Sequence, residues 1–131
     1  MSELSNKTVK IYLRLAIAAG FLSAVADRFG FWPEKVSVWH TMDAFLTYTQ
    51  TLNPWCPAAL IPALGWIATV AELLLGIALL IGYKLKWTAI ASGALLLMFA
   101  LSMSYTVGLK PVFDYAVFAA SAAAFALARL E

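Results

Sequence analysis

The chain has 131 residues, of which 63% are hydrophobic and 12% are charged, whereas soluble domains are roughly 45 to 50% apolar. This composition excludes an ordinary soluble domain and indicates an integral membrane protein in contact with a lipid bilayer. The net charge of +2 is too small for the basic surface of a nucleic-acid-binding protein, so we expect no nucleic-acid partner.

Four apolar runs predict four transmembrane helices that form a single domain over residues 1–131. They extend from Ile11 to Phe29, Ala58 to Gly82, Trp87 to Val107 and Val112 to Leu130. Each is close to the ~20 residues that cross a ~30 Å hydrocarbon layer. The short links at residues 83–86 and 108–111 require antiparallel neighbours. The expected fold is all-α, an antiparallel four-helix bundle in the membrane with a long outer loop between the first and second helices.

The first run has an alternative interpretation as a secretory signal. Lys7 and Lys10 precede it, and Ala24, Val25 and Ala26 resemble a small-residue cleavage site. We expect the segment to be retained as a membrane helix.

Positive charges predict the orientation of the helices. With the N-terminus inside, the inner charges are Lys7, Lys10, Arg14, Lys84, Lys86 and Arg129, and the outer ones are Arg28, Lys35 and Lys110. This asymmetry places both termini in the cytoplasm.

The long outer loop is rich in aromatic residues. Apolar positions recur there at three- and four-residue spacing: Val36, Trp39, Met42, Ala44, Phe45 and Tyr48. The spacing predicts a short amphipathic helix at the outer interface, which either covers the bundle as a lid or anchors the loop as an aromatic belt. His40 stands alone and Cys56 is the single cysteine, so we expect neither a metal site nor a disulfide, and electron transfer would need a bound cofactor or a partner.

Two helical stripes of small and polar residues are expected to face inward. One comprises Ala16, Gly20, Ser23 and Asp27, and the other Gly65, Thr69, Glu72 and Gly76. Glu72 is the exceptional member, because a carboxylate in the middle of an apolar span is by default a functional residue.

The height of each residue along its helix predicts the neighbours of Glu72. Ser23, Ser102 and Ser121 are expected around it, and Arg28 is expected to pair with Asp114 near the outer surface. Direct contact of Arg28 with Glu72 is less favoured, because their Cα levels differ by roughly 12 Å or more in upright helices. It would require a water-filled outer cavity or an inward tilt of Arg28. Without a nearby cation, Glu72 would be neutral and suited to proton handling or ligand binding, whereas with Arg28 close it would be ionised and suited to a structural clamp.

A stretch with an Ala-Glu-Leu start extends from Ala71 and Glu72 to Gly82 and is followed by a short basic turn and another apolar helix. This arrangement resembles the DoxX family of small four-helix membrane proteins, and the resemblance extends over most of the chain. Arg28 with Phe29 at the end of the first helix, and Asp114 with Tyr115 at the start of the last, are similar to pairs in that family.

The resemblance implies a multi-pass protein of the bacterial inner membrane that serves as the membrane component of an oxidoreductase system, since relatives include the membrane subunit of a thiosulfate:quinone oxidoreductase. We expect a quinone-type or other small lipophilic ligand, and a soluble or membrane oxidoreductase as partner. Glu72 would handle a proton as a catalytic residue, and Arg28 would hold an anionic or carbonyl group. The expected cavity is lined by Arg28, Glu72, Ser102, Tyr105 and Asp114. The alternative is a non-catalytic membrane scaffold or small-molecule transport protein, and Gly93 offers a surface for homo-oligomers.

Overall fold

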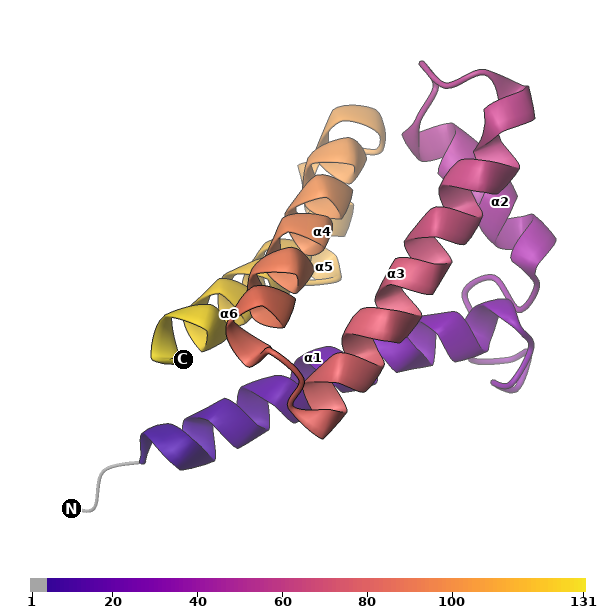
Figure 1. Cartoon of the computed structure of the whole chain (residues 1–131). Coiled ribbons are helices and arrows are strands. Elements are labelled where there is room, and N and C mark those ends of the chain that lie inside the picture. Colours follow the sequence, from indigo (N-terminus) through magenta and orange to yellow (C-terminus); the bar gives the residue numbers. More distant parts are fainter. Residues whose placement is uncertain (1–4) are drawn as a thin grey trace.

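The computed structural model describes residues 5–131, and the regular structure in that part of the chain is helical. Its elements in chain order are α1 (Asn6–Arg28), α2 (Met42–Leu52), the 3-10 turn η1 (Ala58–Leu60), α3 (Ile61–Ile81), α4 (Leu85–Thr106), α5 (Leu109–Asp114) and α6 (Val117–Leu130). Figure 1 shows their arrangement.

Three helices are long and apolar enough to cross a membrane. They cover Asn6–Arg28, Ala58–Ile81 and Leu85–Thr106, with mean hydropathies of 1.6, 2.2 and 1.6. Their positions agree with the first three predicted helices.

The fourth predicted span differs from the structure. The single helix expected from Val112 to Leu130 is instead divided into α5, of six residues, and α6, of 14 residues. The break lies at Ala116, whose φ of 55° is left-handed and incompatible with a continuous right-handed helix. Because α6 is shorter than the ~20 residues that cross a bilayer upright, the prediction of a fourth continuous span is wrong.

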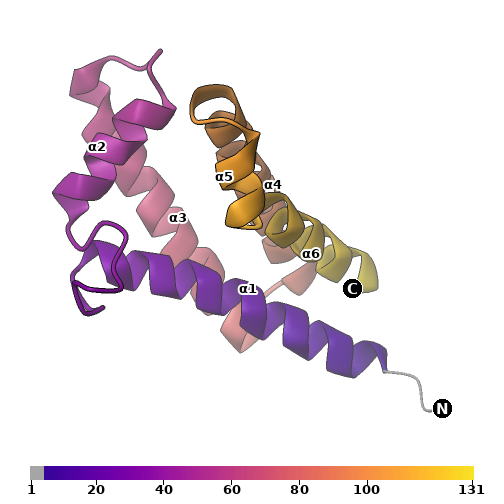
Figure 2. The same ribbon diagram turned by 180° about the vertical axis from the view of Figure 1, so that it is seen from behind.

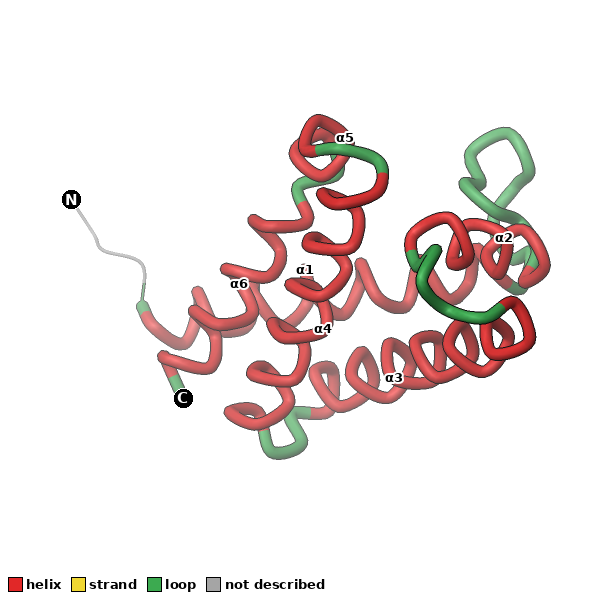
Figure 3. The backbone as a smooth tube through the Cα atoms, turned by 90° about the horizontal axis from the view of Figure 1, so that it is seen from above, coloured by secondary structure: helices red, strands yellow, loops and turns green. Residues whose placement is uncertain are grey.

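The helices form a tapering assembly in which α3 and α4 diverge from the turn that joins them, as Figure 3 shows. Gly82 allows this turn, because its φ of 80° is a left-handed conformation that favours glycine. The most extensive helix contacts are those of α4 with α6 and of α1 with α3. Helix α1 crosses behind the other long helices and faces the viewer in Figure 2. At the divergent end, α2 packs on α3 and α5 on α4.

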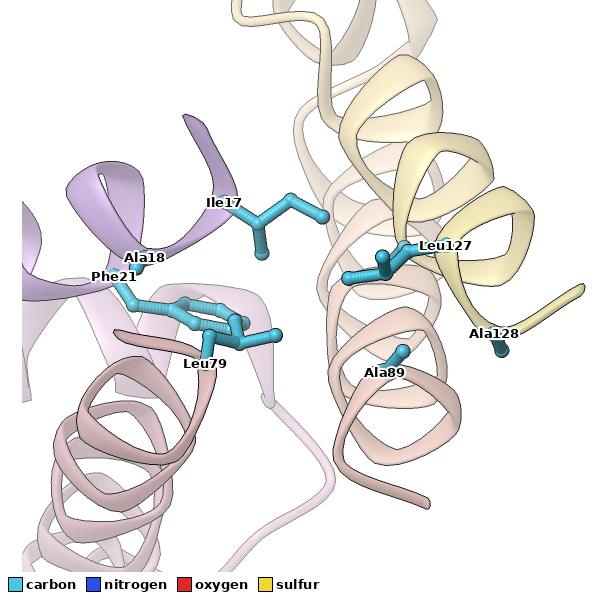
Figure 4. Packing of buried hydrophobic residues seen from close by; sticks show 8 residues of the cluster. Ile17, Ala18, Phe21, Leu79, Ala89, Leu127 and Ala128 are labelled. Atoms are coloured by element: carbon cyan, nitrogen blue, oxygen red, sulfur yellow. The ribbon is translucent and has the colours of Figure 1, made fainter. Parts of the chain in front are cut away.

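An apolar core lies near the narrow end, where four helices meet. Its buried residues come from α1, α3, α4 and α6 and are Ile17, Ala18, Phe21, Leu79, Ala89, Ala124, Leu127 and Ala128, most of which Figure 4 labels. The small alanines allow the backbones of α4 and α6 to approach closely.

The two predicted inward stripes have different outcomes. Gly65, Thr69, Glu72 and Gly76 of α3 are all buried, as predicted. On α1, by contrast, Asp27 is buried but Ala16, Gly20 and Ser23 are exposed. The prediction for those three residues is wrong, because α1 turns its large apolar residues Ile17, Phe21 and Val25 inward instead.

The start of α1, the α3–α4 turn and the end of α6 lie at the same end of the molecule. Arg14 of α1 donates from Nε to the Leu79 carbonyl at 2.9 Å and from Nη2 to the Leu80 carbonyl at 3.0 Å. Lys10 forms an ion pair with Glu131. Arg14 thus satisfies two carbonyl groups that the end of α3 would otherwise leave without partners.

Candidate functional site

The centre of the candidate site is a buried ion pair between α1 and α3. Arg28 Nη2 donates to Glu72 Oε1 at 3.1 Å, and Arg28 Nη1 lies 3.1 Å from Glu72 Oε2. The two side chains are only 3% and 2% exposed. Of the two alternatives left open for Glu72, this geometry is the one with Arg28 close to the carboxyl group, which suits a structural clamp.

Thr69, one turn before Glu72 on α3, also binds Arg28. Arg28 Nη1 donates to the Thr69 hydroxyl at 2.9 Å, and that hydroxyl donates in turn to the Gly65 carbonyl at 2.8 Å. Within the described residues, Arg28 Nε and Glu72 Oε2 are buried without a hydrogen-bond partner. Arg28 thus binds two side chains of α3, Thr69 and Glu72, while one nitrogen of Arg28 and one oxygen of Glu72 lack a hydrogen-bond partner.

Two aromatic rings cover the guanidinium from the side of α2. The Cζ atom of Arg28 lies 3.5 Å from the ring centroid of Phe45 and 5.1 Å from that of Trp39. Such cation–π contacts are worth about 2 kcal/mol or more where water is excluded. The rings of Phe45 and Trp39 thus cover the guanidinium, which is the contact that the lid interpretation of the outer loop requires.

The lid helix differs in extent from the prediction. Helix α2 begins at Met42, where the Thr41 hydroxyl caps it by accepting from the Ala44 amide at 3.1 Å. Val36 and Trp39 were predicted to share its apolar face but lie in the preceding loop. A capping Thr at this position explains the later start, because it satisfies one of the first free amides of the helix.

Asp27 fixes the loop that carries Trp39. Its carboxylate accepts from the backbone amides of Val38 and Trp39 at 3.0 and 3.1 Å through Oδ2, and from that of His40 at 3.2 Å through Oδ1. Three amides on one carboxylate form a strong local anchor. Adjacent residues of α1 thus have separate tasks, since Asp27 holds the loop and Arg28 lies beneath it.

The expected pairing of Arg28 with Asp114 is wrong. Asp114 instead accepts from Lys110, one helical turn earlier in α5, at 2.9 and 3.1 Å, and this pair is exposed. The prediction assumed upright parallel helices. Because α1 crosses α3 obliquely (Figure 2), the end of α1 reaches the level of Glu72.

A largely apolar cavity of about 420 Å³ lies beside the ion pair, between α2 and the divergent halves of α3 and α4. This volume is within the ~300 to 1,000 Å³ typical of small-molecule sites. Its walls are formed by Arg28, Val38, Trp39, Phe45, Tyr48, Thr49, Leu52, Asn53, Leu64, Ile67, Ala68, Ala71, Leu95, Leu96, Met98, Phe99, Ser102, Met103, Tyr115 and Val117. The divergence of α3 and α4 therefore creates a space that the side chains do not fill.

The polar groups of the cavity are mainly neutral. Tyr48 and Asn53 come from α2 and its end, Ser102 from α4, and Tyr115 from the α5–α6 break. Burial raises the pKa of the Tyr48 phenol, and the nearby Tyr115 phenol raises it further. Tyr48 is therefore an uncharged hydroxyl that can both donate and accept a hydrogen bond.

The structure brings together only part of the predicted ligand site. Arg28 and Ser102 line the cavity, while Glu72 is buried behind Arg28. Tyr105 is 88% exposed on α4, and Asp114 is exposed beside Lys110. Neither contributes to the cavity wall, because Tyr105 lies on the exposed face of α4 and Asp114 lies on the exposed side of α5.

Among the described residues, the predicted serines do not surround Glu72. Ser23 is exposed, and the Ser121 hydroxyl donates to the Gly93 carbonyl at 2.8 Å, between α6 and α4. The hydroxyl that reaches the ion pair belongs to Thr69, which the sequence placed on the correct stripe without assigning it a role. Among the described residues, no three His, Cys, Asp or Glu side chains gather into a metal-binding group.

No protein-family model, curated protein or solved structure matches the chain.

Proposed function

We propose that this is a bacterial inner-membrane protein that binds a small lipophilic molecule of the quinone type in the cavity between α2, α3 and α4. The observation that carries the proposal is the cavity itself, which combines apolar walls with a few neutral polar groups. Binding sites for small molecules commonly have this composition. A cavity bounded by membrane-length helices also suits a ligand that partitions from the bilayer.

The oxidoreductase role in this proposal rests on the resemblance to the DoxX family. The protein would be the membrane component of a quinone-linked system, with a soluble or membrane partner that supplies electrons. The single cysteine, Cys56, offers no dithiol chemistry, so the redox group would be the ligand itself.

The membrane orientation in this proposal places both termini in the cytoplasm. The segments that carry the predicted inner charges meet at the narrow end of the molecule, as the contacts of Arg14 with α3 and of Lys10 with Glu131 show. A single cytoplasmic surface for these charges is consistent with the positive-inside rule.

Within this proposal Arg28 and Glu72 are positioning residues. They pair with each other, and the rings of Phe45 and Trp39 cover Arg28. These contacts shape the cavity wall. The same pairing favours a second candidate function, a non-catalytic transport protein or scaffold, because an ion-paired Glu72 does not need to exchange a proton.

The test is to purify the protein in mild detergent and to identify released small molecules by mass spectrometry. Ala68 lines the cavity, whereas Ala63 is exposed on the same helix, so Ala68→Phe should fill the cavity and Ala63→Phe should not. We expect a quinone-type or related lipophilic molecule in the wild type and in Ala63→Phe but not in Ala68→Phe. An empty wild-type protein would contradict the proposal and favour the scaffold function.

A further inference from the structure

We infer that the cavity selects an electrically neutral amphiphile and rejects an anionic one with the same chain. This inference rests on the proposed function and names the ligand class that the cavity accepts. It follows from the charges at the wall, the hydrogen bonds of Arg28 and the positions of the neutral polar groups.

The positive charge in the cavity wall has its counter-ion directly behind it. Among the described residues that line it, Arg28 is the one charged side chain. Its guanidinium is already matched by the Glu72 carboxylate, which lies within 3.1 Å. An anionic headgroup would therefore bring a second negative charge to a single buried cation.

Two of the three guanidinium nitrogens already have hydrogen-bond partners, and among the described residues Nε is the one that has none. Nη1 donates to Thr69 and Nη2 to Glu72, while the Phe45 ring lies 3.5 Å from Cζ. Without displacing Glu72 or the ring, a carboxylate would find only Nε without a partner, and a neutral carbonyl or ester oxygen can accept from Nε equally well. A buried carboxylate without a cationic partner is strongly unfavourable.

Neutral groups suited to an uncharged headgroup lie elsewhere on the wall. Tyr48, Asn53 and Ser102 offer a phenol, an amide and a hydroxyl. Each can donate to a carbonyl or ester oxygen, and each can accept from a hydroxyl. On the deeper part of α3 and α4 the wall is apolar, with Ala71 and Leu95. The expected ligand therefore has an uncharged oxygen-bearing head and a hydrocarbon tail.

A fluorescence experiment tests this selection. Of the five tryptophans, Trp39 alone lines the cavity, so replacing Trp32, Trp55, Trp66 and Trp87 by Phe leaves a reporter at the site. The probes are dibromoundecanoic acid and its methyl ester, because bromine quenches tryptophan at contact. They are compared at pH ~9, where the free acid is ionised.

We expect the ester to quench Trp39 saturably, with a Kd at least ~10-fold lower than that of the acid. Adding Ala68→Phe to the reporter should abolish saturable quenching, and adding Ala63→Phe should not. An acid that binds as tightly as the ester would overturn the inference and leave the proposed function standing. Saturable quenching by neither probe would contradict both.

A second variant tests the cause of the selection. Glu72→Gln retains the side-chain shape but removes the charge that neutralises Arg28. In the folded variant the ratio of the Kd of the acid to the Kd of the ester should fall by at least ~10-fold. An unchanged preference would overturn the assignment of selectivity to the Arg28–Glu72 pair, and the wild-type comparison remains decisive if this variant does not fold.

Discussion

Arg28 and Glu72 lie 44 positions apart in the sequence, yet Arg28 Nη2 and Glu72 Oε1 are 3.1 Å apart in the folded protein. Their pairing joins the end of α1 to the middle of α3, and α2 closes over it with Phe45. One contact thus connects the helix packing with the wall of the cavity.

Removing one partner of this pair should destabilise the protein strongly. Arg28→Met or Glu72→Leu leaves an uncompensated buried charge, which typically costs about 3–5 kcal/mol. The double variant Arg28→Met/Glu72→Leu should recover much of the loss, because the remaining contact is apolar. The thermal midpoint of each variant in detergent measures this.

The exposed pair Lys110–Asp114 provides the control for this comparison. Its side chains are 85% and 55% exposed, so Lys110→Met should change stability by no more than ~1 kcal/mol. Equal losses at the buried and exposed pairs would show that the burial of Arg28 and Glu72 is not what makes them important.

Thr69 should matter through its hydroxyl. Thr69→Val removes the acceptor of Arg28 Nη1 with little change in volume, and a buried donor left without a partner costs roughly 1–3 kcal/mol. Thr69→Ser keeps the hydroxyl and should lose less. Thermal midpoints distinguish the two, and a larger loss for Ser than for Val would indicate that Thr69 acts through its methyl group.

Asp27→Asn should loosen the loop that carries Trp39. The substitution replaces one of the carboxylate oxygens that hold the amides of Val38, Trp39 and His40 by an amide nitrogen, which cannot accept. Limited trypsin digestion should then cut after the exposed Lys35 several times faster. Asp43→Asn is the matched control, because Asp43 is exposed on α2; similar cleavage rates for the two variants would rule out this anchor.

Two glycines on facing helices should respond differently to alanine. A Cβ on Gly76 would lie 2.9 Å from both Cγ and Cδ2 of Leu22, whereas a Cβ on Gly20 meets nothing within 4 Å. Gly20→Ala should keep or raise stability, by up to ~1 kcal/mol of helix propensity. Gly76→Ala should lower the thermal midpoint, because Leu22 must move. A rise in both variants would show that α1 and α3 are less closely packed at Gly76.

The sequence predicts the long helices well because hydropathy and length determine them directly. It does not reveal the break at Ala116, since neither Tyr115 nor Ala116 is Gly or Pro and a left-handed φ is uncommon for Ala. The burial of Gly65, Thr69, Glu72 and Gly76 is predictable from helical spacing. The buried face of α1 is not predictable in this way, because several faces of an apolar helix are equally suited to packing.

The site is less predictable than the fold because it depends on angles between helices. Residue heights assigned to upright helices separate Arg28 from Glu72, while the oblique crossing of α1 brings them together. Tyr48 and Trp39 were predicted on an outer aromatic face, but the cavity that they line exists only because α3 and α4 diverge. Sequence spacing along one helix contains no information about that divergence.

The most direct test of the proposed site is the titration of a decyl-substituted benzoquinone into two single-tryptophan proteins, one retaining Trp39 and the other retaining Trp87. Trp39 lines the cavity, whereas Trp87 is 66% exposed at the narrow end and reports quinone dissolved in the detergent. The account predicts saturable quenching of Trp39 at about one quinone per chain and non-saturable quenching of Trp87. The same non-saturable curve for both tryptophans would contradict a quinone site in this cavity.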